Sequence, residues 1–246
     1  MSSTGLDIGE QAISSAAETL IKSQLDSFDA LNIEVHTDPL KLTQGQVDSV
    51  LVKGKGLVIQ NDLRTEDLSL QTGPVDISMM KIATGTFALD APADAEARVV
   101  LKPEDVQTAF NAAYVKQKMR GQKIDLASGE KVTTDASNVS FTIPEAGRIA
   151  VEADVMLIER VETHHIAFSA KPKLVEQGHG VTLEEVQYDE GANDMPELTR
   201  SLIASTQDLL DFRTFDIGDI TLQFTQLTVE PDQLVFQANA KITSFG

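Results

Sequence analysis

The chain has 246 residues, of which 41% are hydrophobic and 24% are charged, so we expect a soluble globular protein with a sizeable core. Its 38 acidic residues outnumber its 20 basic residues and give a formal net charge of −18, which opposes binding to nucleic-acid phosphates. The chain has no cysteine, and this excludes disulfides, a thiol nucleophile and thiolate metal ligands.

The N-terminal residues MSSTGLDIGEQ contain neither the basic segment nor the apolar run of a secretory signal. No stretch of 18 consecutive apolar residues occurs, so no transmembrane helix is expected. These observations predict a location that is cytoplasmic or peripheral to a membrane, unless an export signal has been removed from the chain. We expect residues 1–8 to form a disordered N-terminus.

The first expected element is a helix from Gly9 to Phe28, because its apolar residues recur at spacings of three and four. Such spacing places one side of the helix against a core. The residues of this apolar face are Ile13, Ala16, Ala17, Leu20, Ile21, Leu25 and Phe28.

Residues 48–60, DSVLVKGKGLVIQ, are predicted to form a strand that contains Gly54 and Gly56 on one face. A dinucleotide fingerprint would need a third glycine where Ile59 stands, followed by a helix, and the chain continues as strand instead. Glycine inside a strand indicates a bend, a bulge or the close approach of another backbone. We therefore interpret the glycines as a feature of shape and not as a phosphate loop.

The segment LKPEDVQTAFNAAYVKQKM, residues 101–119, predicts a second helix. Pro103 suits the first helical position, and Glu104 and Asp105 favour the positive end of the helix dipole. Gly121 lies where a C-cap is expected. The residues of its expected inner face are Val106, Ala109, Phe110 and Ala113.

Apolar and polar residues then alternate with a period of two, which predicts half-buried strands of a mostly antiparallel sheet. The clearest alternation runs over residues 151–157, 166–170, 220–224 and 234–242. Turn signals occur at residues 127–130, 144–147, 178–180 and 230–233.

A third helix is expected after Asp194, with Pro196 in its first turn. The residues of its expected inner face are Leu198, Leu202, Thr206 and Leu209. No linker-like composition divides the chain, so we predict one α+β domain over residues 1–246, in which long antiparallel strands pack against amphipathic helices.

The sequence contains no motif that points to catalysis, a metal or a cofactor. His164 and His165 are neighbours in a predicted strand, so their side chains face opposite sides and cannot chelate one ion together. Neither H-E-x-x-H nor G-x-S-x-G occurs, and the aspartates at residues 208–219 lack the glycine and glutamate of an EF-hand loop. We therefore expect no catalytic residues, no bound metal and no cofactor.

Three segments resemble a known family: TDPLKLTQGQVDSVLVKGKGLVI, ARVVLKPEDVQTAFN and FDIGDITLQFTQLTV. They are similar to segments of the bacterial LmeA-like family, whose members are described as phospholipid-binding, and that family is similar to the TULIP or BPI-like superfamily. The resemblance extends from about Gly9 to Phe245. It implies an elongated, highly curved antiparallel sheet wrapped around helices, with an apolar groove for acyl chains and no catalytic residues.

The candidate lipid-contact residues are apolar residues of the second helix and of four strand positions, for which a packed core is the alternative explanation. These candidates are Val106, Ala109, Phe110, Ala113, Val155, Phe168, Leu222 and Phe224. Lys53 and Lys55, near Lys41, are weaker candidates for an anionic headgroup, and Met119–Lys123 is a second one. Solvated lysines on a strand would explain the same pattern.

The leading hypothesis is non-enzymatic binding of a phospholipid-like ligand, with its acyl chains shielded in an apolar groove, for lipid transport or for sensing at a membrane. The alternative is an interaction scaffold that binds a peptide in the groove or at a strand edge. A hydrolase or transferase would be a third class, and no motif favours it.

Overall fold

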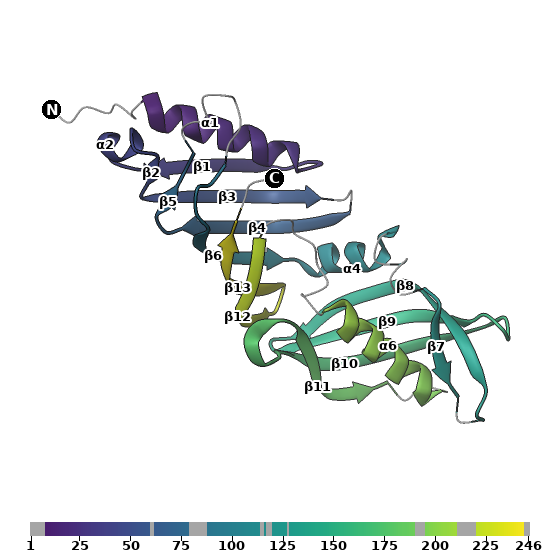
Figure 1. The fold of residues 1–246 in the computed structure, drawn as a ribbon. Coiled ribbons are helices and arrows are strands. Elements are labelled where there is room, and N and C mark those ends of the chain that lie inside the picture. Colours follow the sequence, from purple (N-terminus) through teal and green to yellow (C-terminus); the bar gives the residue numbers. More distant parts are fainter. Residues whose placement is uncertain are drawn as a thin grey trace.

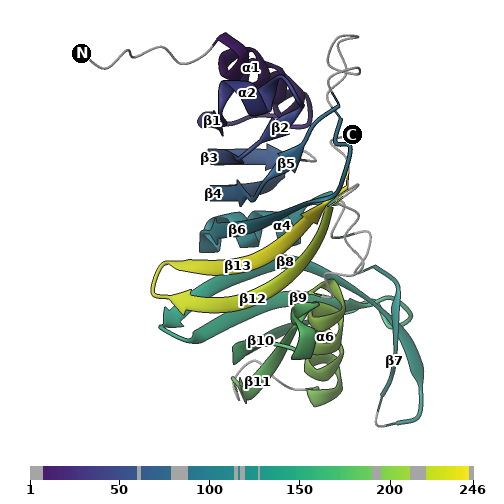
Figure 2. The same cartoon turned by 60° about the vertical axis from the view of Figure 1, so that its left-hand side comes forward.

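The computed structural model describes residues 8–59, 62–78, 88–113, 116, 120–126, 128–189, 195–210 and 220–243. The fold is α+β with mostly antiparallel strands, as predicted (Figure 1). The molecule is elongated, with the N-terminal helix at one end and the second of two large sheets at the other (Figures 1 and 2).

The strands are divided between two large sheets and one small one. The first sheet has six strands in the order β1 (Ala30–His36), β3 (Ser49–Ile59), β4 (Leu63–Thr72), β6 (Ala93–Leu101), β13 (Gln233–Ile242) and β12 (Ile220–Glu230). The second has five, in the order β11 (Val181–Tyr188), β10 (Glu162–Leu174), β9 (Arg148–Leu157), β8 (Lys131–Glu145) and β7 (Gln122–Asp125). The small sheet pairs β2 (Gln46–Val47) with β5 (Val75–Asp76).

The helices begin where the sequence predicted and end differently. The described helices are α1 (Ile8–Ser23), α2 (Pro39–Leu42), α4 (Pro103–Asn111), the single 3₁₀ turn η1 (Glu176–Gly178) and α6 (Pro196–Leu209). The predicted extension of the first helix to Phe28 is wrong, because Asp26 N donates to Val58 O at 2.9 Å and Ser27 bridges to Val58. Pairing with β3 thus ends the helix before its apolar pattern stops.

The second helix is also shorter than its pattern, because Ala112 has an extended backbone and caps α4. Gly121 is not its C-cap: Gly121 N donates to Thr134 O of β8 at 3.1 Å, immediately before β7. Parts of residues 114–119 lie outside the described residues. The short helix α2 was missed, although Asp38 before Pro39 is an N-cap signal, and the Asp38 carboxylate accepts from Leu40 N at 2.8 Å.

Strand register defines one apolar face of the first sheet, which we call the inner surface. Its rows across the sheet are Leu31, Gly54, Leu68, Val99 and Phe236; Ile33, Val52, Leu70, Ala97, Ala238 and Phe224; and Val35, Val50, Thr72, Ala95, Ala240 and Leu222. At the β1 end, Ile13 and Ala17 of α1 pack against this surface. At the β12 end, Val99 and Phe236 join the core of the second sheet.

The glycine pair in β3 is a feature of shape, as predicted, and the atoms nearest to it are side-chain atoms. Gly56 has φ +57°, and the residue after it, Leu57, places its side chain over Gly54. A Cβ on Gly54 would lie 2.6 Å from Leu57 Cδ1, and one on Gly56 would lie 2.0 Å from Asp29 Oδ2. Of the alternatives predicted for this pair, distortion of the strand is the one that the left-handed Gly56 supports, and the atoms nearest to both glycines belong to side chains.

A close backbone contact occurs instead at Gly178, in the 3₁₀ turn η1 between β10 and β11. A Cβ there would lie 1.8 Å from the carbonyl oxygen of Phe224. Gln223 Nε2 also donates to Gln177 O at 3.2 Å. This turn therefore joins the second sheet to β12 of the first.

Candidate functional site

The inner surface has small residues at its centre and large ones at its borders. Neighbouring strands β6 and β13 place five buried alanines side by side: Ala93, Ala95, Ala97, Ala238 and Ala240. Phe224 and Phe236 stand at one border, with ring centroids 5.5 Å apart and an edge-to-face angle of 71°. The sheet surface is therefore low in the middle, because each alanine projects only one carbon from the backbone.

The single polar side chain in these rows is satisfied within the sheet. Thr72 is buried, and its hydroxyl accepts from Val50 N at 2.8 Å. The oxygen of this hydroxyl is therefore paired with a backbone N–H, and the rest of the inner surface in these rows is apolar.

Five of the predicted lipid-contact residues belong to one apolar cluster that lies between the two large sheets. These are Val106, Phe110, Val155, Phe168 and Phe224. Phe110 stacks on Phe141 of β8 with ring centroids 6.4 Å apart. Leu222 packs instead against Ala95, Ala240 and Ile242 on the inner surface. The fold thus gathers residues from α4, β9, β10 and β12, and their contact with lipid stays a prediction.

The two remaining candidates lie at the less buried side of α4. Ala109 is half-buried and Ala113 is exposed. The prediction that Ala113 belongs to the inner helix face is wrong, because α4 ends at Asn111 and Ala113 follows the cap.

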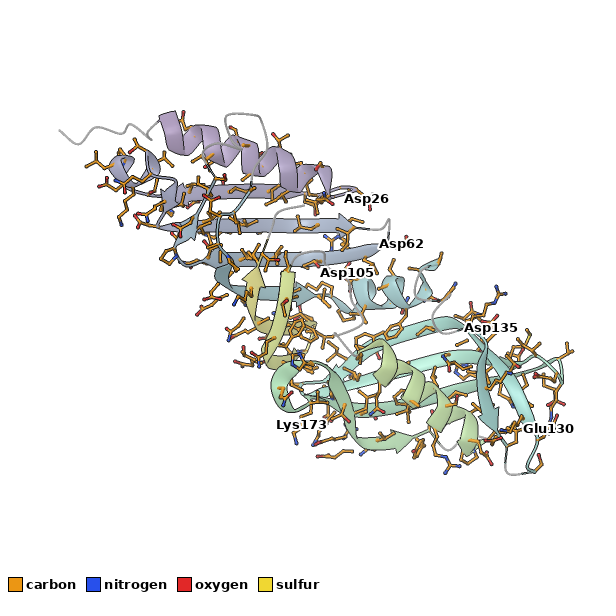
Figure 3. All side chains as sticks on the ribbon, viewed as in Figure 1. Asp26, Asp62, Asp105, Glu130, Asp135 and Lys173 are labelled. Atoms are coloured by element: carbon orange, nitrogen blue, oxygen red, sulfur yellow. The ribbon has the colours of Figure 1, made fainter. Side chains whose placement is uncertain are left out.

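An ionic cluster borders the inner surface at the β3–β4 end. Arg64 Nη1 donates to both carboxylate oxygens of Asp105 at 3.1 Å and to Glu66 at 2.7 Å, while Nη2 donates to Asp29 at 3.2 Å. Hydrogen bonds to Glu66 and then Asp105 raise the pKa of Arg64 above its usual value. Asp105, labelled in Figure 3, is only 6% exposed and lies in the first turn of α4. The cluster therefore connects α4 to β4 and surrounds the guanidinium of Arg64 with three carboxylates.

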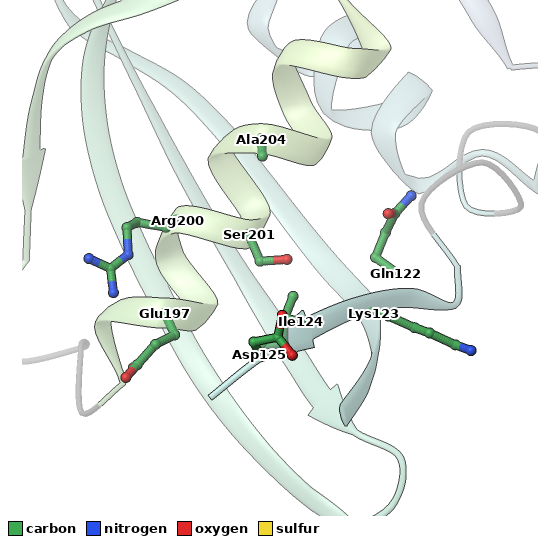
Figure 4. Close-up of a pocket in the computed structure, with 8 residues that line it drawn as sticks. All are labelled: Gln122, Lys123, Ile124, Asp125, Glu197, Arg200, Ser201 and Ala204. Carbon is green, nitrogen blue, oxygen red and sulfur yellow. The ribbon is translucent and has the colours of Figure 1, made fainter. Parts of the chain in front are cut away.

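A polar cavity of about 370 Å³ lies between β7 and α6 (Figure 4). Its lining residues are Gln122, Lys123, Ile124, Asp125, Glu197, Arg200, Ser201 and Ala204. Ser201 points from the helix toward β7, whereas Lys123 and Arg200 point away from each other. Two cations face two carboxylates in this set, so the cavity has no strong preference for an anion. None of the predicted lipid-contact residues lines it.

The lysines proposed for a headgroup lie on the outer face of the first sheet. Lys53 and Lys55 are both exposed, and Lys53 is in register with Asn32 and Ser69. Lys41 forms an ion pair with Asp48 at 2.6 Å, and the hydrogen bond to that carboxylate raises the pKa of Lys41. A headgroup role for Lys53 and Lys55 stays a prediction, and it concerns a phosphate that approaches the outer face.

The second headgroup candidate, Met119–Lys123, is described only in part. Arg120 pairs with Asp135 at 3.4 Å, and Lys123 lines the polar cavity. Met119 lies outside the described residues.

The adjacent histidines face opposite sides of β10, as predicted. His165 Nδ1 lies 3.0 Å from Asp154 Oδ1, while His164 Nε2 lies 3.7 Å from Glu162. Hydrogen bonds from Asn138, at 2.8 Å, and then from His165 lower the pKa of Asp154. Within the described part of the chain, no three His, Asp or Glu side chains are grouped as a metal ion would need.

Among the residues that the structure describes, no helix is both long enough and apolar enough to cross a bilayer.

A family model described as LmeA-like phospholipid-binding matches residues 4–239, which is nearly the whole chain. This match confirms the resemblance that the three sequence segments suggested. No curated protein and no solved structure matches the chain significantly.

Proposed function

The chain belongs to the LmeA-like phospholipid-binding family, and on that premise we propose that it binds a phospholipid-like ligand without chemical turnover. The acyl chains would lie along the inner surface, between the first sheet and the elements that face it. The observation that carries this proposal is the low, apolar centre of the inner surface, where five alanines from β6 and β13 adjoin.

The physical basis of the proposal is apolar burial. Each methylene group that leaves water contributes about 0.8 kcal/mol, so a few methylenes per chain suffice for useful affinity. The larger residues around the alanines, among them Leu70 and Phe236, would act as side walls for an acyl chain. Contacts of this kind select for aliphatic character and not for one chain length.

Fewer residues are candidates for binding the polar headgroup of the ligand. Three carboxylates pair with Arg64, and their negative charge opposes the approach of a phosphate, so Arg64 is a poor candidate for the phosphate ligand. A headgroup would therefore remain at the rim of the inner surface and stay largely hydrated. This arrangement favours recognition of acyl chains over recognition of a particular headgroup, and it suits a carrier or a sensor that meets lipids at a membrane.

The proposal is tested by filling the low centre of the inner surface. Ala238→Leu adds bulk where an acyl chain would lie, and we expect it to weaken binding of a fluorescent phospholipid about tenfold, since it displaces roughly two methylene contacts. Gln237→Leu is the matched control, because Gln237 is exposed on the opposite face of the same strand.

The free energy of unfolding of the same two variants distinguishes a space that holds lipid from an ordinary packed core. Overpacking a filled core costs about 1–3 kcal/mol, whereas filling a ligand space costs the ligand-free protein little. A clearly destabilised Ala238→Leu variant, or one that takes up lipid as the wild type does, would refute the placement of the acyl chains.

A further inference from the structure

The turn between β9 and β10, residues 158–161, exposes aliphatic side chains where turns ordinarily carry polar ones. Val161 is 82% exposed, the highest value for a large hydrophobic side chain among the described residues, and Ile158 is 43% exposed. Both side chains lie outside the apolar clusters that hold the fold together. They therefore contribute little to the core.

The backbone of the same turn is unfavourable for the residue it carries. Val161 has φ +57°, in the left-handed region, and its N–H closes the turn onto Leu157 O at 2.8 Å. Glycine or asparagine adopts this conformation readily, whereas a β-branched residue is strained there. An exposed valine at this position lowers stability without adding packing, which indicates a role outside the fold.

The two charged residues of the turn are held back against the neighbouring hairpin. The Glu159 carboxylate accepts from Thr133 N and Oγ1, each at 2.6 Å, and these bonds lower the pKa of Glu159. Arg160 Nε donates to Glu130 at 3.2 Å, and the hydrogen bonds to that carboxylate raise the pKa of Arg160. Glu130 lies at the β7–β8 turn, far from α1 (Figure 3). Glu159 is exposed but hydrogen-bonded, so Ile158 and Val161 are the apolar side chains that the turn presents to solvent.

We propose that residues 158–161 form a membrane-docking turn, in which Ile158 and Val161 enter the interfacial layer of a phospholipid bilayer. The inference rests on the proposed function, since a protein that exchanges lipid has to meet the bilayer. The engaged charges of Glu159 and Arg160 support it, because neither would enter the interface unpaired.

A bilayer fits this turn better than a protein partner does. A stable protein interface buries about 800 Å² on each side and depends on aromatic or arginine anchors. The turn has no aromatic residue, and its arginine, Arg160, is engaged by Glu130. A bilayer needs only a few aliphatic side chains to enter its interface. The net charge of −18 also disfavours electrostatic attraction to anionic lipid, so we expect docking on zwitterionic phosphatidylcholine.

The test is sedimentation of the whole chain with phosphatidylcholine vesicles. Val161→Gly should raise Tm by a few degrees, because glycine relieves the left-handed strain, and should weaken vesicle binding several-fold. The double change Ile158→Ser with Val161→Gly should weaken binding at least about tenfold. Leu40→Ser is the matched control: Leu40 is 74% exposed on α2, at the other end of the molecule, and its replacement should leave binding unchanged (Figure 1).

Opposite effects on stability and binding distinguish docking from a structural role. A Val161→Gly variant that is more stable and binds vesicles as the wild type does would overturn the proposal. Binding abolished near 1 M salt, where the Debye length is about 3 Å, would overturn it too, because docking by aliphatic groups persists there. Loss of a dimer in place of vesicle binding would assign the turn to contact between copies of the chain.

The inference and the proposed function fail in different ways. If the turn docks on membranes, the purified Val161→Gly variant should keep any co-purified lipid, and its binding to vesicles should fall. A lipid-free protein that still binds vesicles through Val161 would refute the proposed function and leave the docking turn in place.

Discussion

Gly54 and Gly56 act together to change the direction of side chains along β3. The left-handed conformation of Gly56 turns Leu57 onto the face that Gly54 leaves open. Sequence reasoning found the position and the general cause, since paired glycines in a strand indicate distortion. It could not show which atoms would fill the space, because Asp29, which precedes β1, and Arg64 of β4 reach Gly56 from other parts of the chain.

We expect Gly56→Ala to destabilise the protein by about 2–3 kcal/mol, because it combines left-handed strain with a contact to the Asp29 carboxylate. Gly129→Ala is the matched control: Gly129 has φ +82° and nothing within 4 Å of its added Cβ, so it measures strain alone, about 1 kcal/mol. Urea unfolding of the two variants measures both losses of stability. Equal losses would show that the Asp29 contact at Gly56 relaxes at no cost.

Among the elements, α4 takes the place of a strand beside β8. Strand β7 pairs only with residues 131–134 of β8. Further along, Asn111 Nδ2 donates to Val139 O at 2.6 Å and Asn111 Oδ1 accepts from Val139 N at 3.1 Å. Gln107 Oε1 accepts from Phe141 N at 3.3 Å. Side-chain amides thus complete the hydrogen bonding of a strand edge where no strand lies.

We expect Asn111→Ala to cost about 2–3 kcal/mol, because it leaves the N–H and C=O of the buried Val139 without partners. Hydrogen exchange at the Val139 amide should become faster. Thr108→Ala is the control on the same helix, since Thr108 is exposed and its hydroxyl donates to Glu104 O within the helix, and its effect should stay within about 0.5 kcal/mol. Unchanged exchange at Val139 in the Asn111 variant would contradict this role of α4.

Sequence patterns predicted where helices begin better than where they end. Helix starts were predicted from Pro103 and Pro196 because proline and acidic residues act locally. The ends of α1 and α4 were not predicted, because strand pairing at Ser27 and the extended backbone of Ala112 stop these helices before their apolar pattern ends. These are tertiary effects that no local window contains.

For the whole molecule, alternation predicted an antiparallel α+β fold, while the division into two sheets depends on distant pairing. Strand β13 lies beside β6, with Ala238 in register with Ala97, and this joins the C-terminal strands to the middle of the first sheet (Figure 2). The five alanines of the inner surface become neighbours only through that pairing. The aliphatic turn at Val161 was missed as well, although two aliphatic residues enclosing Glu159 and Arg160 are a visible signal.

Ligand content tests the central claim most directly. The protein purified from cells should carry a non-covalent ligand, seen by native mass spectrometry, and organic extraction should release a phospholipid-like molecule. Such a ligand is expected because the low apolar centre of the inner surface would be shielded from water by acyl chains. A co-purifying polypeptide would favour the interaction scaffold instead. A ligand-free mass, together with no uptake of fluorescent phospholipid, would contradict the account.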